Sequence, residues 1–172
     1  PEPAGAPQLD YNFYIENERV IITERRRGTP IDKVVSELMI YVNTAWGKLL
    51  ADHDMAAIYR AQGNGKVKMT TTPREHQGLG VGQYIWASSP LRRYVDLINQ
   101  RQLVAWPNGD TPPYANNSER LLIAMRDFEL AYEAHNHFQR NMERYWCLRW
   151  LQQESVSHIP ATVIRENLVK MD

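Results

Sequence analysis

Apolar and polar positions alternate near the start of the chain. Tyr11, Phe13 and Ile15 alternate with more polar neighbours, and a period of two is typical of a half-buried β-strand. Residues 16–18 are polar and suit a turn, and residues 19–23 then return as a second apolar segment. The pattern predicts a β-hairpin.

A period close to 3.6 follows in residues 29–54 and predicts a long helix. Thr29 is a good N-cap residue, Pro30 suits the first helical position, and Asp32 places a negative charge in the first turn. The predicted apolar stripe consists of Val35, Leu38, Met39, Val42, Trp46 and Leu49.

A second helix is predicted from the Ser-Pro pair in ASSPLRRYVDLINQRQL, with Ser89 as N-cap and Pro90 as its first residue. We expect it to end before WPNGDTPPY, which is rich in turn-forming residues. Its predicted buried face consists of Leu91, Tyr94, Val95 and Ile98.

A long helical pattern then covers residues 118–154, either unbroken or interrupted at the polar segment EAHNHFQRN. Short strands are expected at residues 67–71 and in QYIWA, and near the C-terminus in ATVIREN, which has nothing after it to pair with. The predicted fold is α+β and mostly helical, with an N-terminal β-hairpin, short strands and three main helices.

Composition narrows the class of protein only slightly. The 172 residues are 43% hydrophobic and 23% charged, with a formal net charge of zero, so a nucleic-acid site would have to be a local basic surface. Residues 1–8 read as a tail or linker. Cys147 has no second cysteine to pair with, which favours a reducing compartment, taken here as the cytoplasm. No apolar run is long enough to span a membrane, and the start at Pro1 predicts a piece of a longer protein.

Two adjacent arginines, Arg92 and Arg93, fall in the first turns of the predicted second helix. Cations there oppose the helix dipole at a cost of about 0.3 kcal/mol or more. With the free N–H groups and the Ser89 hydroxyl they could form a phosphate site. Alternatively, Arg92 could pair with Asp96 one turn later, and Arg93 could cover its own helix with its aliphatic stem. The pattern alone leaves both interpretations open.

The same segment resembles a known signature. YIWASSPLRRYVDLINQRQL is similar to Y-x-x-x-T/S-S-P-I/L-R-R-Y-x-D-L-x-x-x-R-x-L of the RNB family, the ribonuclease II and ribonuclease R exoribonucleases. Further family-like segments occur in the same order: LDYNFYIENERVIITERRRGTPIDKVVSELMIYVN, IYRAQ, PREHQGLGVGQY and NMERYWCLRWLQQE. The resemblance covers residues 9–154.

The resemblance implies that the chain forms part of an RNB-type α/β catalytic domain. Such enzymes degrade single-stranded RNA from the 3′ end, and magnesium ions held by aspartates activate the attacking water. Arg92 matches the family arginine that contacts the scissile phosphate, and Ser89 and Arg93 are expected to support RNA binding beside it. Glu37 matches the second glutamate of an EELM-like motif near the RNA end, where a carboxylate can accept a ribose hydroxyl. A surface ion pair with Lys33 is the alternative.

Glu143 matches the glutamate of the family's AER-like motif and is the last expected RNA-binding residue. On a helix it shares a side with Cys147 and Trp150, which predicts a half-buried carboxylate that binds a ribose hydroxyl or a basic residue such as Arg140.

The family's metal-binding aspartate block, D-x-x-x-x-x-D-D-A, does not occur in this sequence. We therefore expect residues 9–154 to be the C-terminal half of the catalytic domain, and residues 155–172 to begin a following strand segment. This chain would bind no metal, would need the rest of the parent domain as its partner, and would be inactive alone. The alternatives are a non-catalytic RNA-binding domain of a degenerate family member and a purely structural α+β domain.

Overall fold

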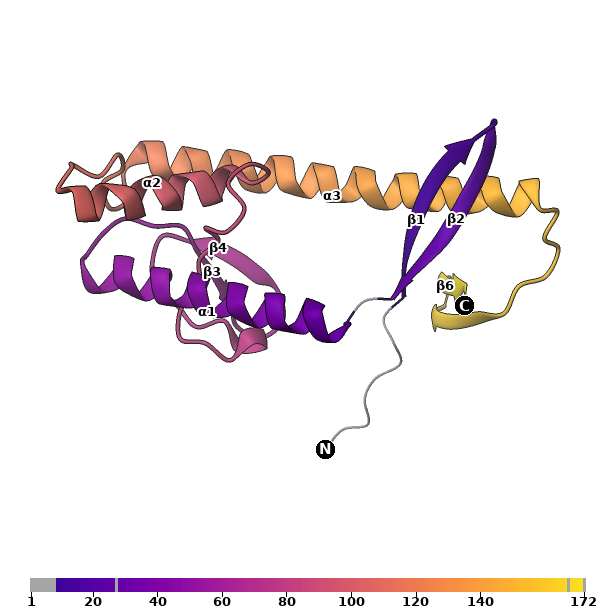
Figure 1. Ribbon diagram of the computed structural model, residues 1–172, viewed down its shortest axis with the longest axis horizontal. Helices are drawn as coiled ribbons and strands as arrows, with labels where there is room; N and C mark the ends of the chain where they lie inside the picture. The colour runs from indigo at the N-terminus through magenta and orange to yellow at the C-terminus, as the bar shows by residue number, and fades with distance from the viewer. Residues whose placement is uncertain (1–8, 27, 167, 172) are drawn as a thin grey trace. The chain divides into compact units, whose positions relative to one another are not determined.

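The computed structural model describes residues 9–26, 28–166 and 168–171. Figure 1 shows helices and short antiparallel hairpins, so the predicted α+β, mostly helical class is confirmed. The elements in chain order are β1 (Leu9–Glu16), β2 (Arg19–Arg26), α1 (Pro30–Asp52), β3 (Tyr59–Gln62), β4 (Val67–Thr70), a 3-10 turn (Gln77–Leu79), α2 (Tyr94–Asn108), α3 (Glu119–Gln153), β5 (Ala161–Arg165) and β6 (Leu168–Met171).

The chain divides into two compact units. Unit 1 comprises the described residues of Pro1–Gly28 and Asn136–Asp172, and unit 2 comprises Thr29–His135. Helix α3 begins in unit 2 and ends in unit 1 without interruption. The alternative of a break at EAHNHFQRN is therefore wrong.

In unit 1, strands β1 and β2 form the predicted N-terminal hairpin. Glu16 pairs with Arg19 across a two-residue turn, whose residues Asn17 and Glu18 have positive φ angles of 49° and 63°. A two-residue hairpin needs this left-handed conformation, and asparagine adopts it more readily than most residues.

The hairpin is fastened to the end of α3. The Gln153 side chain accepts a hydrogen bond from the Val20 N–H at 2.8 Å and donates one to the Val20 carbonyl at 3.0 Å. Arg19 and Glu154 form an exposed ion pair beside it.

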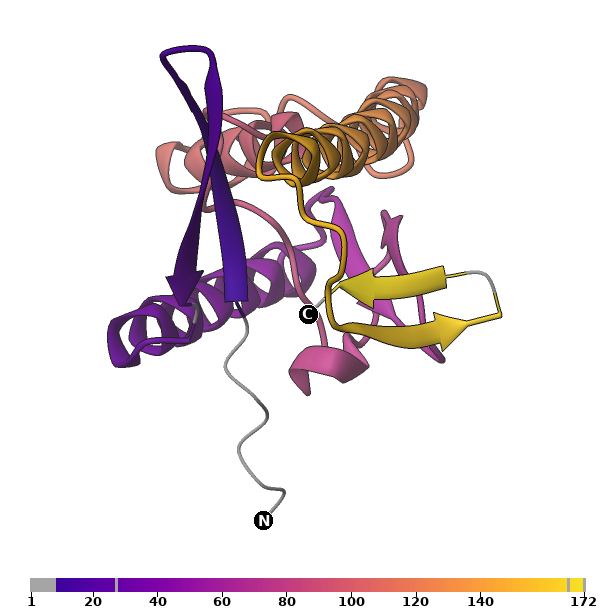
Figure 2. The same ribbon diagram turned by 90° about the vertical axis from the view of Figure 1, so that its right-hand side faces the viewer.

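The C-terminal segment of unit 1 differs from its prediction. ATVIREN was expected to lack a pairing strand, but β5 pairs antiparallel with β6, as Figure 2 shows in yellow. The pair is irregular between Val163 and Arg165.

In unit 2, α1 begins as its sequence predicts. The Thr29 hydroxyl accepts from the Asp32 N–H, and the Asp32 carboxylate accepts from the Thr29 N–H, which together form a capping box. The predicted apolar stripe is only partly covered, because Val35 and Leu38 are exposed within the described residues. The buried residues of α1 are Asn43, Gly47 and Leu50, in its second half.

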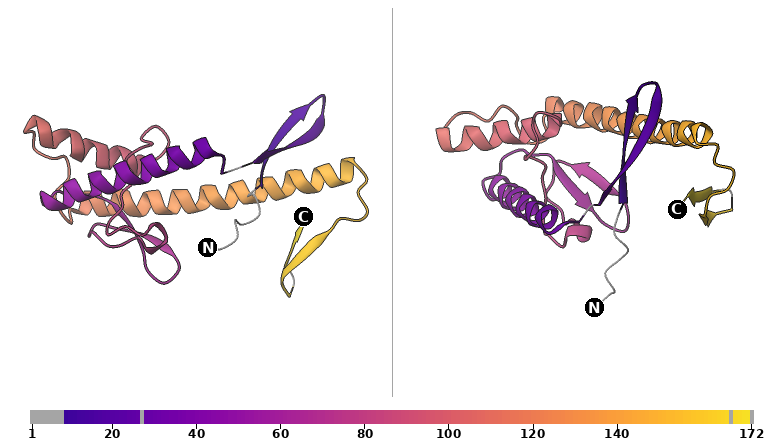
Figure 3. Two further views of the ribbon diagram at one scale, coloured as in Figure 1. Left: turned by 60° about the horizontal axis from the view of Figure 1, so that its bottom comes forward. Right: turned by 45° about the vertical axis from the view of Figure 1, so that its right-hand side comes forward.

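The core of unit 2 lies around β3, α2 and the first turns of α3. Figure 3 shows the ribbons of these elements together with α1. Two clusters of buried apolar residues make up this core. The first contains Ala56, Ile58, Val95, Ile98, Tyr114 and Leu121, and the second contains Leu50, Ala57, Tyr59, Ile85 and Ala87. Gly47 lets α1 approach the second cluster, since a Cβ there would lie 3.3 Å from the Ile85 side chain.

The strand predicted in QYIWA is reduced to one bridge between Tyr59 and Ile85. Side chains occupy the backbone groups that a strand partner would need: Asn43 accepts from the Ala87 N–H, and Asn99 donates to the Trp86 carbonyl. The other predicted strand, at residues 67–71, is confirmed as β4.

Helix α2 begins at Tyr94, with Arg93 as N-cap, so the predicted start at Ser89 and Pro90 is wrong. Its predicted buried face is half right: Val95 and Ile98 are buried, whereas Leu91 and Tyr94 are exposed. The helix also continues through WPN to a left-handed C-cap at Gly109, beyond its expected end.

Candidate functional site

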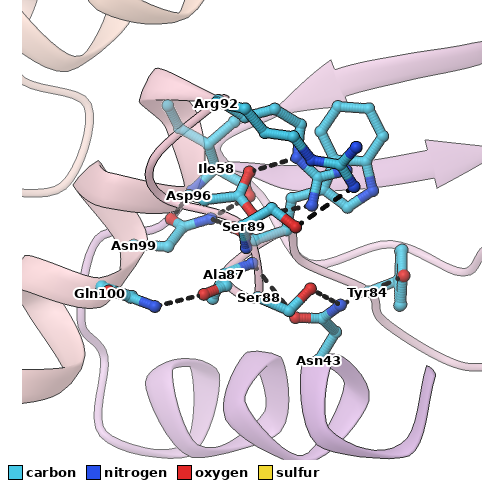
Figure 4. A network of polar contacts seen from close by, with 12 residues as sticks. Asn43, Ile58, Tyr84, Ala87, Ser88, Ser89, Arg92, Asp96, Asn99 and Gln100 are labelled. Carbon is cyan, nitrogen blue, oxygen red and sulfur yellow. Dashed lines mark hydrogen bonds and ion pairs between the residues drawn. The ribbon is translucent and has the colours of Figure 1, made fainter. Parts of the chain in front are cut away.

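The loop that leads into α2 is held by side-chain amides. Figure 4 shows Asn43 from α1 and Asn99 and Gln100 from α2 directed at this loop. Gln100 donates to the Ala87 carbonyl at 2.6 Å, and Asn43 donates to the Ser88 hydroxyl at 3.2 Å. Asn43 and Asn99 are buried, and their further bonds to the Ala87 N–H and the Trp86 carbonyl satisfy backbone groups of this loop and fix it.

Asp96 holds the basic motif, which consists of Ser89, Arg92 and Arg93, through hydrogen bonds to Ser89 and Arg93. Its carboxylate is fully buried and accepts from the Ser89 N–H at 2.8 Å and from the Arg93 guanidinium at 2.8 and 2.7 Å. An aspartate in the first turn of α2 also interacts favourably with the helix dipole. The predicted alternative, in which Arg92 pairs with Asp96, is therefore wrong: Arg93 takes that place with two parallel hydrogen bonds.

Arg92 is left free by this arrangement. It lies in the turn before α2 and is exposed, and its guanidinium donates to the Ser89 hydroxyl at 3.4 Å (Figure 4). Within the described residues, no carboxylate lies at ion-pair distance from Arg92. The two neighbouring arginines thus differ in kind, since one is neutralised by a buried partner and the other is available to an external anion.

Trp86 connects this motif to a third arginine. The guanidinium carbon of Arg93 lies 3.9 Å from the centroid of the Trp86 ring, and that of Arg60, in β3, lies 3.6 Å from the same centroid. Both distances are in the range of cation–π contacts. Tyr132 of α3 meets the Trp86 ring edge-on, with centroids 5.7 Å apart.

Sequence reasoning did not select Arg60, although the IYRAQ segment that carries it was recognised. Arg60 is half-buried, and burial lowers its pKa, with Arg93 adding to the effect while Tyr132, Tyr84 and Glu129 oppose it. The position of Arg60 in the family-like segment IYRAQ was the one feature of the sequence that could have indicated a role for it.

Glu37 lies on an exposed part of α1, in the same unit as Arg92. The described part of the chain shows no ion pair between Glu37 and Lys33, so that alternative is wrong for this structure.

Glu143 lies in α3 within the other unit, unit 1. It is exposed rather than half-buried, and it accepts from Gln139 at 3.2 Å instead of pairing with Arg140. Burial, with a smaller effect of Glu143, raises the pKa of Cys147. The structure therefore brings Ser89, Arg92 and Arg93 together around Asp96. Glu37 is exposed on α1 of the same unit, and Glu143 belongs to the other unit.

A second basic feature lies on the β3–β4 hairpin. Lys66, Lys68 and Arg74 line one groove together with Asn64 and Glu75. Glu75 accepts from the Gln77 side chain, and the described residues place no carboxylate at ion-pair distance from these three cations. The groove is a basic surface of the kind that a phosphate backbone can follow.

The described residues contain no group of three or more histidine, cysteine or acidic side chains placed to hold a metal ion. Asp52 and Asp54 are two acidic residues close together in the sequence, and both are engaged by protein groups: Asp52 pairs with Lys48, and Asp54 accepts from Asn116. None of the described helices is long and apolar enough to cross a membrane.

An exposed guanidinium on a loop held by side-chain hydrogen bonds, near two further arginines that contact an indole ring, is an arrangement that can bind an anion. The RNB domain family model matches residues 64–109, which contain Arg92, Arg93 and Asp96. The resemblance to the RNB family is thus confirmed.

Curated relatives agree with this match. The chain is 25% identical to an uncharacterized ribonuclease of Synechocystis, over 70% of this chain and 22% of that protein. It is 24% identical to the mitochondrial exoribonuclease II of Saccharomyces cerevisiae, over 70% of this chain and 16% of that protein. The chain spans about a fifth of the length of these relatives.

Solved structures share the fold. An active-site mutant of the Dss1 exoribonuclease from Candida glabrata matches with a TM-score of 0.79 and 19% identity, over 96% of this chain and 26% of that one. Ribonuclease R of Mycoplasma genitalium in complex with double-stranded RNA matches with a TM-score of 0.70 and 16% identity, over 95% and 40%. The same enzyme with ribose-methylated single-stranded RNA matches with a TM-score of 0.69 and 16% identity, over 95% and 35%.

Proposed function

We propose that this chain forms the RNA-phosphate-binding part of a magnesium-dependent 3′→5′ exoribonuclease that degrades single-stranded RNA. The observation that carries the proposal is the free Arg92 guanidinium, exposed beside Ser89 within the segment that matches the RNB model. A guanidinium in this position can stabilise the negative charge that develops on a phosphate during hydrolysis.

The remaining site residues take supporting roles in this proposal. Arg93 is a positioning residue, because its hydrogen bonds to Asp96 fix the turn from which Arg92 projects. The Ser89 hydroxyl orients the Arg92 guanidinium or binds the phosphate directly. Glu37 and Glu143 are exposed carboxylates that can accept ribose 2′-hydroxyl groups, a contact that DNA would lack.

Magnesium would act as the Lewis acid and activate the attacking water. Its ligands would be the family's aspartates, which we propose lie in another part of the catalytic domain. The part of the domain that carries the aspartates would then be the partner of this chain. The chain alone would bind RNA without releasing nucleotides.

The test compares the 172-residue chain with the longest form of the protein that contains it, using labelled single-stranded RNA with and without magnesium. We expect the longer form to release mononucleotides only when magnesium is present, and chelation to stop the reaction. Arg92→Ala should slow the reaction about 10²–10³-fold, the usual effect of removing a donor that stabilises transition-state charge. Arg126→Ala, which changes an exposed arginine of the same unit, should leave the rate unchanged.

Each rival interpretation has its own outcome. RNA binding without cleavage by the longer form would favour a non-catalytic RNA-binding domain, and no binding at low salt would favour a structural domain. Mononucleotide release by the 172-residue chain itself would overturn the placement of the metal ligands elsewhere. Normal cleavage by Arg92→Ala would overturn the central assignment.

We propose the cytoplasm as the compartment, on the basis of the single cysteine. The mitochondrial relative from yeast supplies the alternative, and imaging the tagged protein in its own cell would decide between them.

A further inference from the structure

Two guanidinium groups share the Trp86 ring, but only one of them is neutralised. Arg93 pairs with the buried carboxylate of Asp96 at 2.7 Å. Arg60 lies over the same ring at 3.6 Å, and within the described residues its side chain has neither an ion pair nor a hydrogen bond to a protein acceptor.

A half-buried guanidinium without a carboxylate has lost part of its hydration and gains little in return. The indole face compensates part of this loss. The acidic side chain that acts on Arg60, Glu129, accepts a hydrogen bond from the Met69 N–H at 3.1 Å instead. Arg60 therefore retains hydrogen-bond donors and a positive charge that no described protein group satisfies.

The neighbours of Arg60 leave room for its charge to act on an external anion such as a phosphate. Arg93 is close enough to lower the pKa of Arg60, but its own charge is paired with Asp96, so Arg60 supplies the unpaired positive charge at this ring. Trp86 also belongs to the loop that carries Ser89 and Arg92, which the amides of Asn43 and Asn99 hold in place. An anion near Arg60 would thus meet a preformed, positively charged surface with one aromatic wall.

We propose that Arg60 is a second phosphate-binding residue and contacts a backbone phosphate of the RNA strand other than the one held by Arg92. The Trp86 ring holds its guanidinium in position, and Arg93 with Asp96 holds the ring. This inference rests on the proposed function, because it assigns a further contact to the same RNA substrate.

The experiment measures the affinity of the full chain for a fluorescein-labelled oligoadenylate by anisotropy over a series of salt concentrations. Each phosphate contact with single-stranded nucleic acid contributes about −0.7 to the slope of log K against log salt. Arg60→Gln should weaken binding about tenfold and make the slope shallower by about 0.7. Arg60→Lys keeps the charge and should retain the slope, with an intermediate affinity.

Two controls isolate the effect. Arg126→Gln removes a charge from an exposed pair in the same unit and should change neither affinity nor slope. Arg92→Gln should by itself lower the affinity and make the slope shallower. In the double variant, the changes in slope caused by Arg60→Gln and Arg92→Gln should add. Circular dichroism of each variant confirms that it is folded. If Arg60→Gln unfolds, Arg60→Ala replaces it as the charge-removing variant, and Arg60→Lys stays the charge-retaining control.

A wild-type slope for Arg60→Gln, together with a reduced slope for Arg92→Gln, would overturn the inference and leave the proposed function standing. Equal changes in Arg60→Gln and Arg126→Gln would also overturn it, since the effect would then be general surface charge. No binding by the unaltered chain at low salt would reject the proposed function, and the inference with it.

Discussion

Arg92 and Arg93 are neighbours in the sequence with different physical roles. Arg93 is 14% exposed and bonded to a carboxylate that is 0% exposed, so its charge is used within the protein. Arg92 is exposed beside a serine hydroxyl, so its charge is available. The distinction arises from the backbone, because the turn before α2 directs one side chain onto the Trp86 ring and the other outward.

Tyr59 gives a pH-dependent prediction at the same scale. Burial, and to a smaller extent Asp52, raises its pKa from 10.0 to about 12. The folded state therefore holds the phenol proton more tightly than the unfolded state. This contribution to stability is fully present below about pH 10 and is lost as the pH rises through about 12.

When the pH rises from about 9 to about 11, the ionisation of Tyr59 in the unfolded state should lower the free energy of unfolding by about 1 kcal/mol, given 1.36 kcal/mol per pKa unit. Urea unfolding at both pH values measures this decrease in the free energy of unfolding. In Tyr59→Phe the decrease should be smaller by about 1 kcal/mol. Equal pH dependence in the two proteins would show that the tyrosine ionises as easily in the folded state as in the unfolded one.

At the scale of the element, α2 begins where its hydrogen bonds can be satisfied. Asp96, in the first turn of α2, accepts from the Ser89 N–H, and the Ser89 side chain accepts from the Arg92 guanidinium rather than from the helix backbone. Ser89 instead accepts from the Arg92 and Arg93 N–H groups through its carbonyl, at 3.2 and 3.1 Å. A turn forms there, and the helix proper starts at Tyr94.

Asp96→Asn tests this arrangement. The substitution keeps the shape of the side chain but leaves Arg93 largely buried without a counter-charge, so we expect the free energy of unfolding to fall by about 3–5 kcal/mol. The matched change Asp127→Asn breaks an exposed pair with Arg126 and should cost less than about 1 kcal/mol. Chemical denaturation measures both, and similar losses would contradict the assigned role of Asp96.

At the scale of the whole molecule, buried apolar side chains are distributed unevenly between the units. Apart from Val20, every buried apolar residue of the described chain lies in unit 2. Within α3, the buried residue is Leu121, near its start, whereas the part of the helix in unit 1 has no fully buried side chain among those described. Local stability should follow this distribution.

Hydrogen exchange should therefore be slowest in α2 and the first turns of α3, and at least about tenfold faster in residues 136–150. Ile98→Ala, which truncates a fully buried side chain, should cost about 2–5 kcal/mol and speed exchange within unit 2. Mass spectrometry of peptic peptides measures both regions. An equal change in residues 136–150 would mean that the two units unfold as one.

The sequence by itself determined the elements whose causes are local. Alternation and a polar turn predicted the β1–β2 hairpin. Thr29 as N-cap and Pro30 as first residue predicted the start of α1, and a long helical pattern predicted α3 almost to the residue. The sequence also located the adjacent arginines Arg92 and Arg93 and their resemblance to the RNB family, because a motif is recognised without knowledge of contacts.

Only the tertiary structure decided which arginine is free and where α2 begins. Both depend on the buried Asp96, which pairs with Arg93 and accepts from the Ser89 N–H, and no local pattern reports burial. The strand predicted in QYIWA failed because Asn43 and Asn99 take its backbone hydrogen bonds from far away in the chain.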